Sequence, residues 1–148
     1  MKKSLFRSVL FTTSLILVAL GTFAQCRSVA KKQCFPLLTP YIQNGQFNSA
    51  RLAPGETAEM QMTFYAGQNY RLMLCAENVL GDVTFRVLDA DKKELFNSKK
   101  AELKQWDFKV DETMQLFVLV EVPLSDAPTS KVITPEGCVS ILVGFKKM

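Results

Sequence analysis

The chain has 148 residues, of which 48% are apolar, with 18 basic and 14 acidic side chains and a formal net charge of +4. This length accommodates one domain with a hydrophobic core and is short for two. The chain has no histidine, which excludes catalytic sites that need an imidazole and removes the most common protein ligand of zinc and copper.

Residues 1–24 have the three-part layout of a secretory signal peptide. Met1–Arg7 is basic, Val9–Leu20 is largely apolar, and Thr22 and Ala24 are small residues at the two positions that a signal peptidase reads. We therefore predict cleavage after Ala24 and an exported protein, periplasmic or extracellular. A retained membrane anchor is the alternative, because Leu5–Ala24 approaches the roughly 20 residues that span a bilayer.

The positive charge belongs mostly to this segment. Without residues 1–24 the chain has 15 basic and 14 acidic residues and a net charge of +1. We therefore expect no binding of nucleic acid and contact with a membrane during export only. Lipid attachment at Cys26 is disfavoured, because Gln25 stands where a lipoprotein signal has a small residue.

Residues 25–40 contain two cysteines, three basic residues and two prolines. We expect them to form a leader, closed by a disulfide, in front of a β-domain that spans residues 41–148.

From residue 41 onward, short segments of alternating apolar and polar residues are separated by turn residues. Asn44-Gly45 lies between residues 41–43 and 46–47 and is typical of a hairpin turn. Residues 57–65 and 70–76 flank a turn that contains Gly67, which predicts a second hairpin. Further strands are predicted at 83–87, 95–96, 104–110, 114–122 and 139–145, and the one helix-compatible segment is 99–105.

This spacing predicts an all-β fold, a single antiparallel β-sandwich that is jelly-roll-like. All six prolines fall between the predicted strands, where a missing amide breaks no ladder hydrogen bond.

Three segments resemble the bacterial pre-peptidase C-terminal domain. They are Gly55-Glu56 at the entry of a strand, residues 65–70 at a corner, and residues 85–91. Such domains are small jelly-roll-like sandwiches, usually attached to secreted enzymes as binding or processing modules. The resemblance covers roughly residues 50–122 and implies a fold and an accessory role, but no functional residue. This chain differs from the pattern in its paired cysteines and in having no catalytic domain.

The four cysteines, Cys26, Cys34, Cys75 and Cys138, all follow the predicted cleavage site, and an even number in an exported chain predicts two disulfides. Alternation places Cys75 and Cys138 on the outer faces of two strands. Outward cysteines on neighbouring strands can form a bridge when their Cα atoms lie about 4.4–6.8 Å apart. We therefore predict the pairs Cys75–Cys138 and Cys26–Cys34. A redox role is disfavoured, because the chain has no Cys-x-x-Cys motif.

Candidate contacts for a ligand or partner lie at one turn and in one long loop. Tyr65 and Tyr70 flank the turn at 66–69, where their amphipathic rings either cover the end of the sandwich or contact a ligand. Loops as long as 123–137 are often functional. The candidate contacts in that loop are Asp126, Thr129 and Ser130, and a plain connection between strands is the alternative.

Two further features favour structural roles. Trp106 alternates with Phe108 and Val110, which indicates a core residue rather than a platform for stacking sugars. Asp82, Asp89 and Asp91 suggest calcium, but the spacing lacks the glycine and distal glutamate of an EF-hand loop and favours ordinary turn acids. We predict no metal site, cofactor or catalytic residue.

These observations favour a secreted or periplasmic, non-catalytic binding or accessory protein whose partner is an envelope glycan or protein. One alternative is a structural or adhesive subunit of the cell surface, which would expose a free strand edge or a large apolar patch. Another is a hydrolase without histidine, which would need acidic side chains that converge in a deep pocket.

Overall fold

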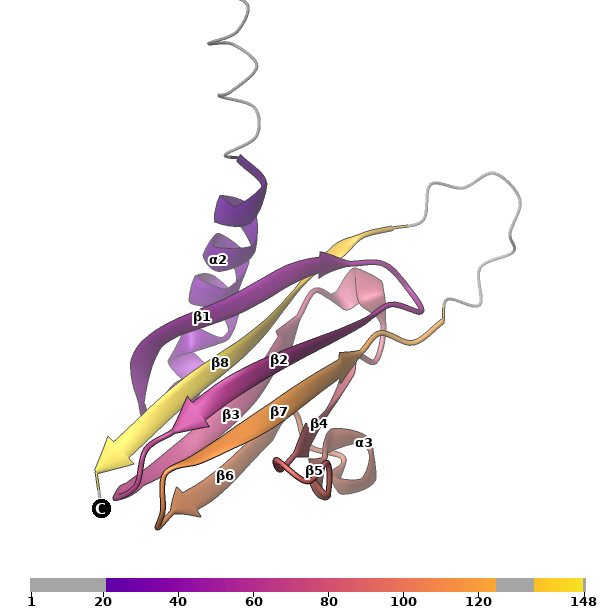
Figure 1. Cartoon of the computed structure of the whole chain (residues 1–148). Coiled ribbons are helices and arrows are strands. Elements are labelled where there is room, and N and C mark those ends of the chain that lie inside the picture. Colours follow the sequence, from indigo (N-terminus) through magenta and orange to yellow (C-terminus); the bar gives the residue numbers. More distant parts are fainter. Residues whose placement is uncertain (1–20, 125–134, 148) are drawn as a thin grey trace, which may run out of the picture.

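The computed structural model describes residues 21–124 and 135–147, with side chains from Cys26 onward. The strands of this part form two antiparallel sheets that face each other (Figure 1). Sheet A has the order β1 (Ile42–Leu52), β8 (Gly137–Lys147), β3 (Gln68–Ala76) and β6 (Gln105–Val110). Sheet B has the order β2 (Thr57–Phe64), β7 (Met114–Glu121), β4 (Thr84–Leu88) and β5 (Glu94–Asn97).

This strand order is that of a jelly roll. Successive strands alternate between the two sheets, except that β4 and β5 lie in the same sheet, and the first strand pairs with the last. β1 pairs with β8, β2 with β7, β3 with β6 and β4 with β5. The predicted fold class is thereby confirmed, including the antiparallel sandwich and the presence of two disulfides.

The main core lies between the sheets and follows the predicted alternation. On β3, Leu72 and Leu74 point inward and lie opposite Val143 and Ile141 of β8. Sheet B contributes the inward residues of β2, β4 and β7, which are almost fully buried: Met62, Phe64, Phe85, Val87, Leu116, Val118 and Val120.

A second, smaller apolar layer lies on the opposite face of sheet A. It is covered by α2 (Gly21–Gln33) and the 3-10 helix η1 (Phe35–Leu38), which together we call the outer layer (Figure 1). Ala30 and Leu38 of this layer are buried against the outward residues Met73, Cys75 and Leu142 of β3 and β8. No helix among the described residues is long and apolar enough to cross a membrane.

Gly144, the one glycine that the sequence places inside a strand, allows the outer layer to approach. A Cβ atom at this position would lie 2.8 Å from the Cβ atom of Tyr41 and 3.2 Å from the Cδ2 atom of Leu38. The close contact between this strand and the chain at residues 38–41 therefore requires a residue without a side chain.

The predicted disulfide pairing is wrong. The structure has Cys26–Cys138 and Cys34–Cys75, with Cα–Cα distances of 5.2 and 6.1 Å. Cys75 and Cys138 do lie on neighbouring strands and face outward, but that face is covered by α2. Cys26 lies in the helix and Cys34 directly after it, and eight residues of helix span about 12 Å, which is too far for a disulfide between them. Each cysteine of the outer layer therefore bonds to a strand of sheet A.

Both predicted hairpins are also wrong. β2 and β3 belong to different sheets, so the chain at residues 65–67 forms a corner between the sheets. Residues 41–47 do not form a hairpin, because β1 begins at Ile42 and pairs with β8 both before and after the Asn44-Gly45 turn. Between Gln43 and Phe47, β1 has three residues where β8 has one, which makes the Asn44-Gly45-Gln46 segment a bulge.

The helix-compatible segment 99–105 is partly confirmed by the short helix α3 (Ser98–Ala101), whose first turn is capped by the Asn97 side chain. β6 already begins at Gln105. A second 3-10 helix, η2 (Asn78–Leu80), connects β3 to β4.

Candidate functional site

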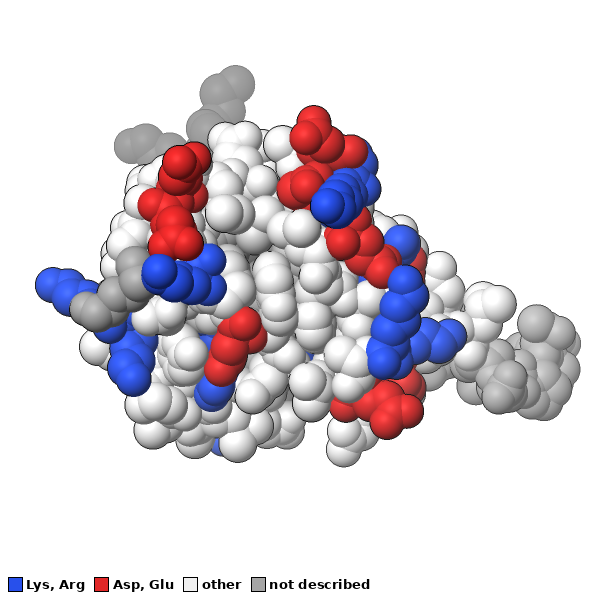
Figure 2. All heavy atoms as spheres, turned by 90° about the horizontal axis from the view of Figure 1, so that it is seen from below, with Lys and Arg blue, Asp and Glu red and all other residues white. Residues whose placement is uncertain are grey.

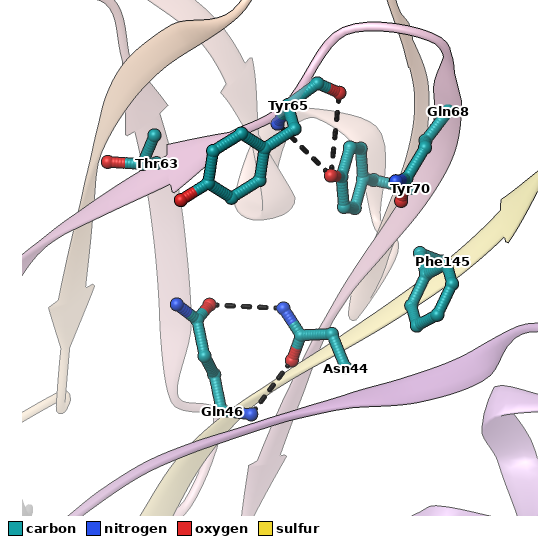
Figure 3. Close-up of a pocket in the computed structure, with 7 residues that line it drawn as sticks. All are labelled: Asn44, Gln46, Thr63, Tyr65, Gln68, Tyr70 and Phe145. Atoms are coloured by element: carbon teal, nitrogen blue, oxygen red, sulfur yellow. Dashed lines mark hydrogen bonds between the residues drawn. The ribbon is translucent and has the colours of Figure 1, made fainter.

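A hollow of about 230 Å³ opens at one end of the sandwich. At this end β1 begins and β8 ends (Figure 1). We call this hollow the corner hollow, because the corner between β2 and β3 forms one of its walls. Its lining residues come from β1, β2, β3, β8 and the corner, and they are Asn44, Gln46, Thr63, Tyr65, Gln68, Tyr70 and Phe145 (Figure 3).

The bulge of β1 forms the wall opposite the tyrosines (Figure 3). Gly45 has a φ of +84°, which glycine adopts without strain. This turn lets the Asn44 Oδ1 atom accept a hydrogen bond from the Gln46 backbone amide at 2.9 Å, and Asn44 Nδ2 donates to Gln46 Oε1 at 3.1 Å. The bulge thus holds two amide side chains together at the mouth of the hollow, as bulges often re-aim side chains at functional sites.

The two tyrosines of the corner have different roles. The Tyr70 side chain is only 4% exposed, and its hydroxyl accepts from the Tyr65 backbone amide at 3.1 Å and donates to the Tyr65 carbonyl oxygen at 3.5 Å. Tyr65 is 62% exposed. Tyr70 therefore fixes the backbone of the corner, and Tyr65 presents its ring and hydroxyl to solvent beside the hollow (Figure 3).

The corner hollow is uncharged, and its lining combines polar groups with apolar surface. Its lining has three amide side chains, a threonine, two phenols and the ring of Phe145. The Thr63 and Gln68 side chains and the Tyr65 hydroxyl make no hydrogen bond to any other described residue, so they are available to a ligand. A hollow of this size lies below the usual 300–1,000 Å³ of sites for drug-sized molecules. It therefore fits one small ring or a single protruding group.

The chain just before the bulge is fixed by Arg71 of β3. Its guanidinium makes two bonds to the Asp107 carboxylate, at 2.7 and 2.6 Å, and lies 4.5 Å from the centre of the Tyr41 ring. The hydrogen bond from Arg71 lowers the pKa of Asp107, and burial together with Asp107 raises the pKa of Tyr41. This cluster links sheet A to the chain that enters β1, and we assign it a structural role.

The structure does not place the other predicted contact residues. Asp126, Thr129, Ser130 and most of the loop 123–137 lie outside the described residues. Trp106 is half-buried and stacks on Phe108 at 4.1 Å and on Phe96 at 5.6 Å, so it packs against the core as predicted.

The aspartates considered for calcium make ordinary contacts. The Asp89 carboxylate accepts hydrogen bonds from the backbone amides of Asp91 and Lys93, both at 2.9 Å, which is a typical turn geometry. Asp82 forms an ion pair with Lys104 at 2.6 Å. Within residues 21–124 and 135–147, no group of three or more acidic or cysteine side chains is arranged to hold a metal ion.

A second hollow, of about 350 Å³, lies between β5 and α3 and includes the ion pair of Glu94 with Lys100 at 2.6 Å. The hydrogen bond from Lys100 lowers the pKa of Glu94. Figure 2 shows the wider pattern on one face of the molecule, where acidic and basic side chains lie beside one another. The charges of the second hollow already satisfy each other, which makes it less suited to a ligand than the corner hollow.

No family model matches the chain, and no curated protein matches it. The resemblance to the pre-peptidase C-terminal domain therefore remains an interpretation of residues 50–122. Among solved structures, the chain is similar to a periplasmic inhibitor of g-type lysozyme from Aeromonas hydrophila, with 11% identity and a TM-score of 0.47. The match covers 68% of this chain and 85% of that protein. At this level it carries no argument about function.

Tyr65 and Tyr70 line the corner hollow and were named from the sequence as candidate contacts, and their contact with a ligand stays a prediction. The opposite wall was not predicted. Asn44 and Gln46 stand around a dipeptide whose turn preference was recognised, but that preference does not distinguish a hairpin from a bulge. Gln68 and Phe145 reach the hollow only because β3 and β8 are neighbours in sheet A, and alternation within a strand does not reveal its partners.

Proposed function

We propose that this protein is an exported, non-catalytic binding protein, and that the corner hollow takes a neutral sugar residue of an envelope glycan. The observation that carries the proposal is the lining of the hollow, which combines amides, hydroxyls and aromatic rings without a charged group.

A sugar ring matches this lining in three respects. Amide side chains have both donors and acceptors and can bond neighbouring hydroxyl groups. The aromatic rings of Tyr65 and Phe145 offer apolar surface to the C–H faces of a sugar. An uncharged ligand requires no counter-ion, and the lining has none. Without a carboxylate, thiol or amine in the lining, binding is favoured over hydrolysis.

The test is an NMR titration of the exported, oxidised protein with neutral oligosaccharides released from envelope glycan. We expect saturable shifts of backbone signals at the bulge and the corner. Tyr65→Ala and Gln68→Ala should each weaken binding about fivefold, since one aromatic contact or hydrogen bond contributes about 1 kcal/mol. Leu103→Ala, at an exposed residue away from the hollow, is the matched control and should bind as the parent does.

Shifts confined to other parts of the molecule, or unchanged affinity in Tyr65→Ala, would contradict the site. If sugars cause no shifts but a protein binds through Tyr65 and Gln68, the site holds and the ligand class is wrong.

A further inference from the structure

Helix α2 has one buried face and one basic face. Cys26 and Ala30 are buried against sheet A, whereas Arg27, Lys31 and Lys32 are exposed. Arg27 and Lys31 are separated by one turn of the helix, so their side chains lie on the same side. None of these three cations forms an ion pair with another described residue, although Arg27 also lies 5.7 Å from the centre of the Phe47 ring.

The basic face belongs to a part of the chain without acidic residues. Residues 25–55 contain four basic residues and no acidic one, whereas residues 56–148 contain eleven basic and fourteen acidic ones, a net charge of −3. On sheet B, by contrast, cations are paired, as in Arg86 with Glu121 at 2.7 Å and Lys92 with Glu59 at 3.2 Å. Of the four basic residues in 25–55, Arg51 pairs with Glu136 at 3.7 Å. The uncompensated positive charge is therefore that of Arg27, Lys31 and Lys32 on α2.

The two disulfides present this charge on a fixed helix. The three cations lie between Cys26 and Cys34. The bonds Cys26–Cys138 and Cys34–Cys75 attach both ends of this segment to sheet A. The helix is already folded, and its residues Cys26 and Ala30 are buried against sheet A, so docking does not require the helix to fold. Its partner should be recognised by charge alone.

We propose that the basic face of α2 docks the protein on an anionic phospholipid surface. Charge complementarity is the main argument, since each cation near such a surface contributes about 1 kcal/mol. Such docking would be a second contact with a membrane, after the contact during export that the sequence predicts. This proposal is independent of the corner hollow.

The test uses the oxidised protein recovered from the exported fraction, sedimented with vesicles of phosphatidylcholine alone or mixed in equal parts with phosphatidylglycerol. We expect binding to the mixed vesicles only, decreasing at least tenfold between about 50 and about 500 mM salt. Arg27→Gln/Lys31→Gln/Lys32→Gln should weaken binding by about 100-fold, the equivalent of three contributions of about 1 kcal/mol.

The matched control, Lys93→Gln/Lys99→Gln/Lys146→Gln, removes the same charge from exposed positions elsewhere and should bind nearly as the parent does. Circular dichroism of both variants should match that of the parent, which checks that they keep the fold. Equal losses in the two variants, no binding to mixed vesicles, or binding to heparin in place of vesicles through the same three residues would overturn the proposal.

Discussion

The two outer faces of the sandwich differ in what covers them. On β3 the outward residues are Arg71, Met73 and Cys75, and the last two are buried beneath the outer layer. On β2 the outward residues are Glu59, Gln61 and Thr63, of which the first two are exposed to solvent. The face of sheet A carries a second apolar layer held by disulfides, and the face of sheet B carries ion pairs.

The outer layer is held by disulfides because it buries much less apolar surface than the core between the sheets. The core between the sheets contains many large side chains and needs no covalent bond. The layer beneath α2 has a small buried cluster in which Ala30 and Leu38 are the contributions of the outer layer. A short helix with so little buried surface is marginal by itself. The two disulfides therefore compensate for a small apolar contact.

The largest expected effect is the loss of a disulfide. The bond Cys26–Cys138 links residues 112 apart and Cys34–Cys75 residues 41 apart. On the loop-entropy model, replacing each pair by serine should lower the free energy of unfolding by roughly 5 and roughly 4 kcal/mol, respectively. Urea unfolding of both variants measures this. A change below about 1 kcal/mol in either would contradict the dependence of the outer layer on its bonds.

A matched pair of core substitutions sharpens the comparison of the layers. Ile141 and Leu142 are neighbours on β8, both 0% exposed, and face the inner core and the outer layer, respectively. Either one changed to alanine should cost about 2–5 kcal/mol. In a Cys26→Ser/Cys138→Ser background, the cost of Leu142→Ala should fall by more than about 0.5 kcal/mol, because α2 is less firmly held, and that of Ile141→Ala should not change.

Urea unfolding of the resulting double-mutant cycles gives both coupling energies. If Ile141→Ala and Leu142→Ala show equal coupling energies with the loss of the disulfide, the inner core and the layer beneath α2 are not energetically independent.

The smallest expected effect concerns the ion pair at the edge of the outer layer. Arg71 lowers the pKa of Asp107 in the folded protein. The pair therefore stabilises the fold above the unfolded value of about 3.9, and this contribution is lost as the pH falls through the lower folded pKa. Since Asp107 is partly exposed, we expect less than about 1 kcal/mol.

Unfolding measured between pH 6 and pH 3 should show a smaller acid-dependent loss in Asp107→Asn than in the parent. Asp111→Asn, which removes a carboxylate from another ion pair, is the control. An identical pH profile for the parent and Asp107→Asn would rule out this contribution.

The sequence predicted which face of a strand a side chain occupies, but not which strands are neighbours in a sheet. Alternation correctly placed Leu72 and Leu74 inward and Cys75 outward, because it depends only on the geometry of one strand. It could not show that β2 and β3 lie in different sheets, since partners depend on contacts between distant segments. The same limit hid the corner hollow, and of its lining residues the sequence indicated only Tyr65 and Tyr70 as candidate contacts.

Two signals for the outer layer were nevertheless present. Cys26, Ala30 and Cys34 are spaced by four residues, a spacing that would place three small side chains on one face of a helix. Residues 139–144 are almost continuously apolar, as in strands buried on both faces. Together they indicate a helix packed on the outside of this strand, an arrangement that excludes a bond between Cys26 and Cys34.

The difference between the two outer faces depends on which cysteines are joined. Peptide mass mapping of the exported protein under non-reducing conditions tests this most directly. The account predicts one linked peptide pair containing Cys26 and Cys138 and another containing Cys34 and Cys75. A pair joining Cys26 to Cys34, or Cys75 to Cys138, would contradict the placement of α2 on sheet A.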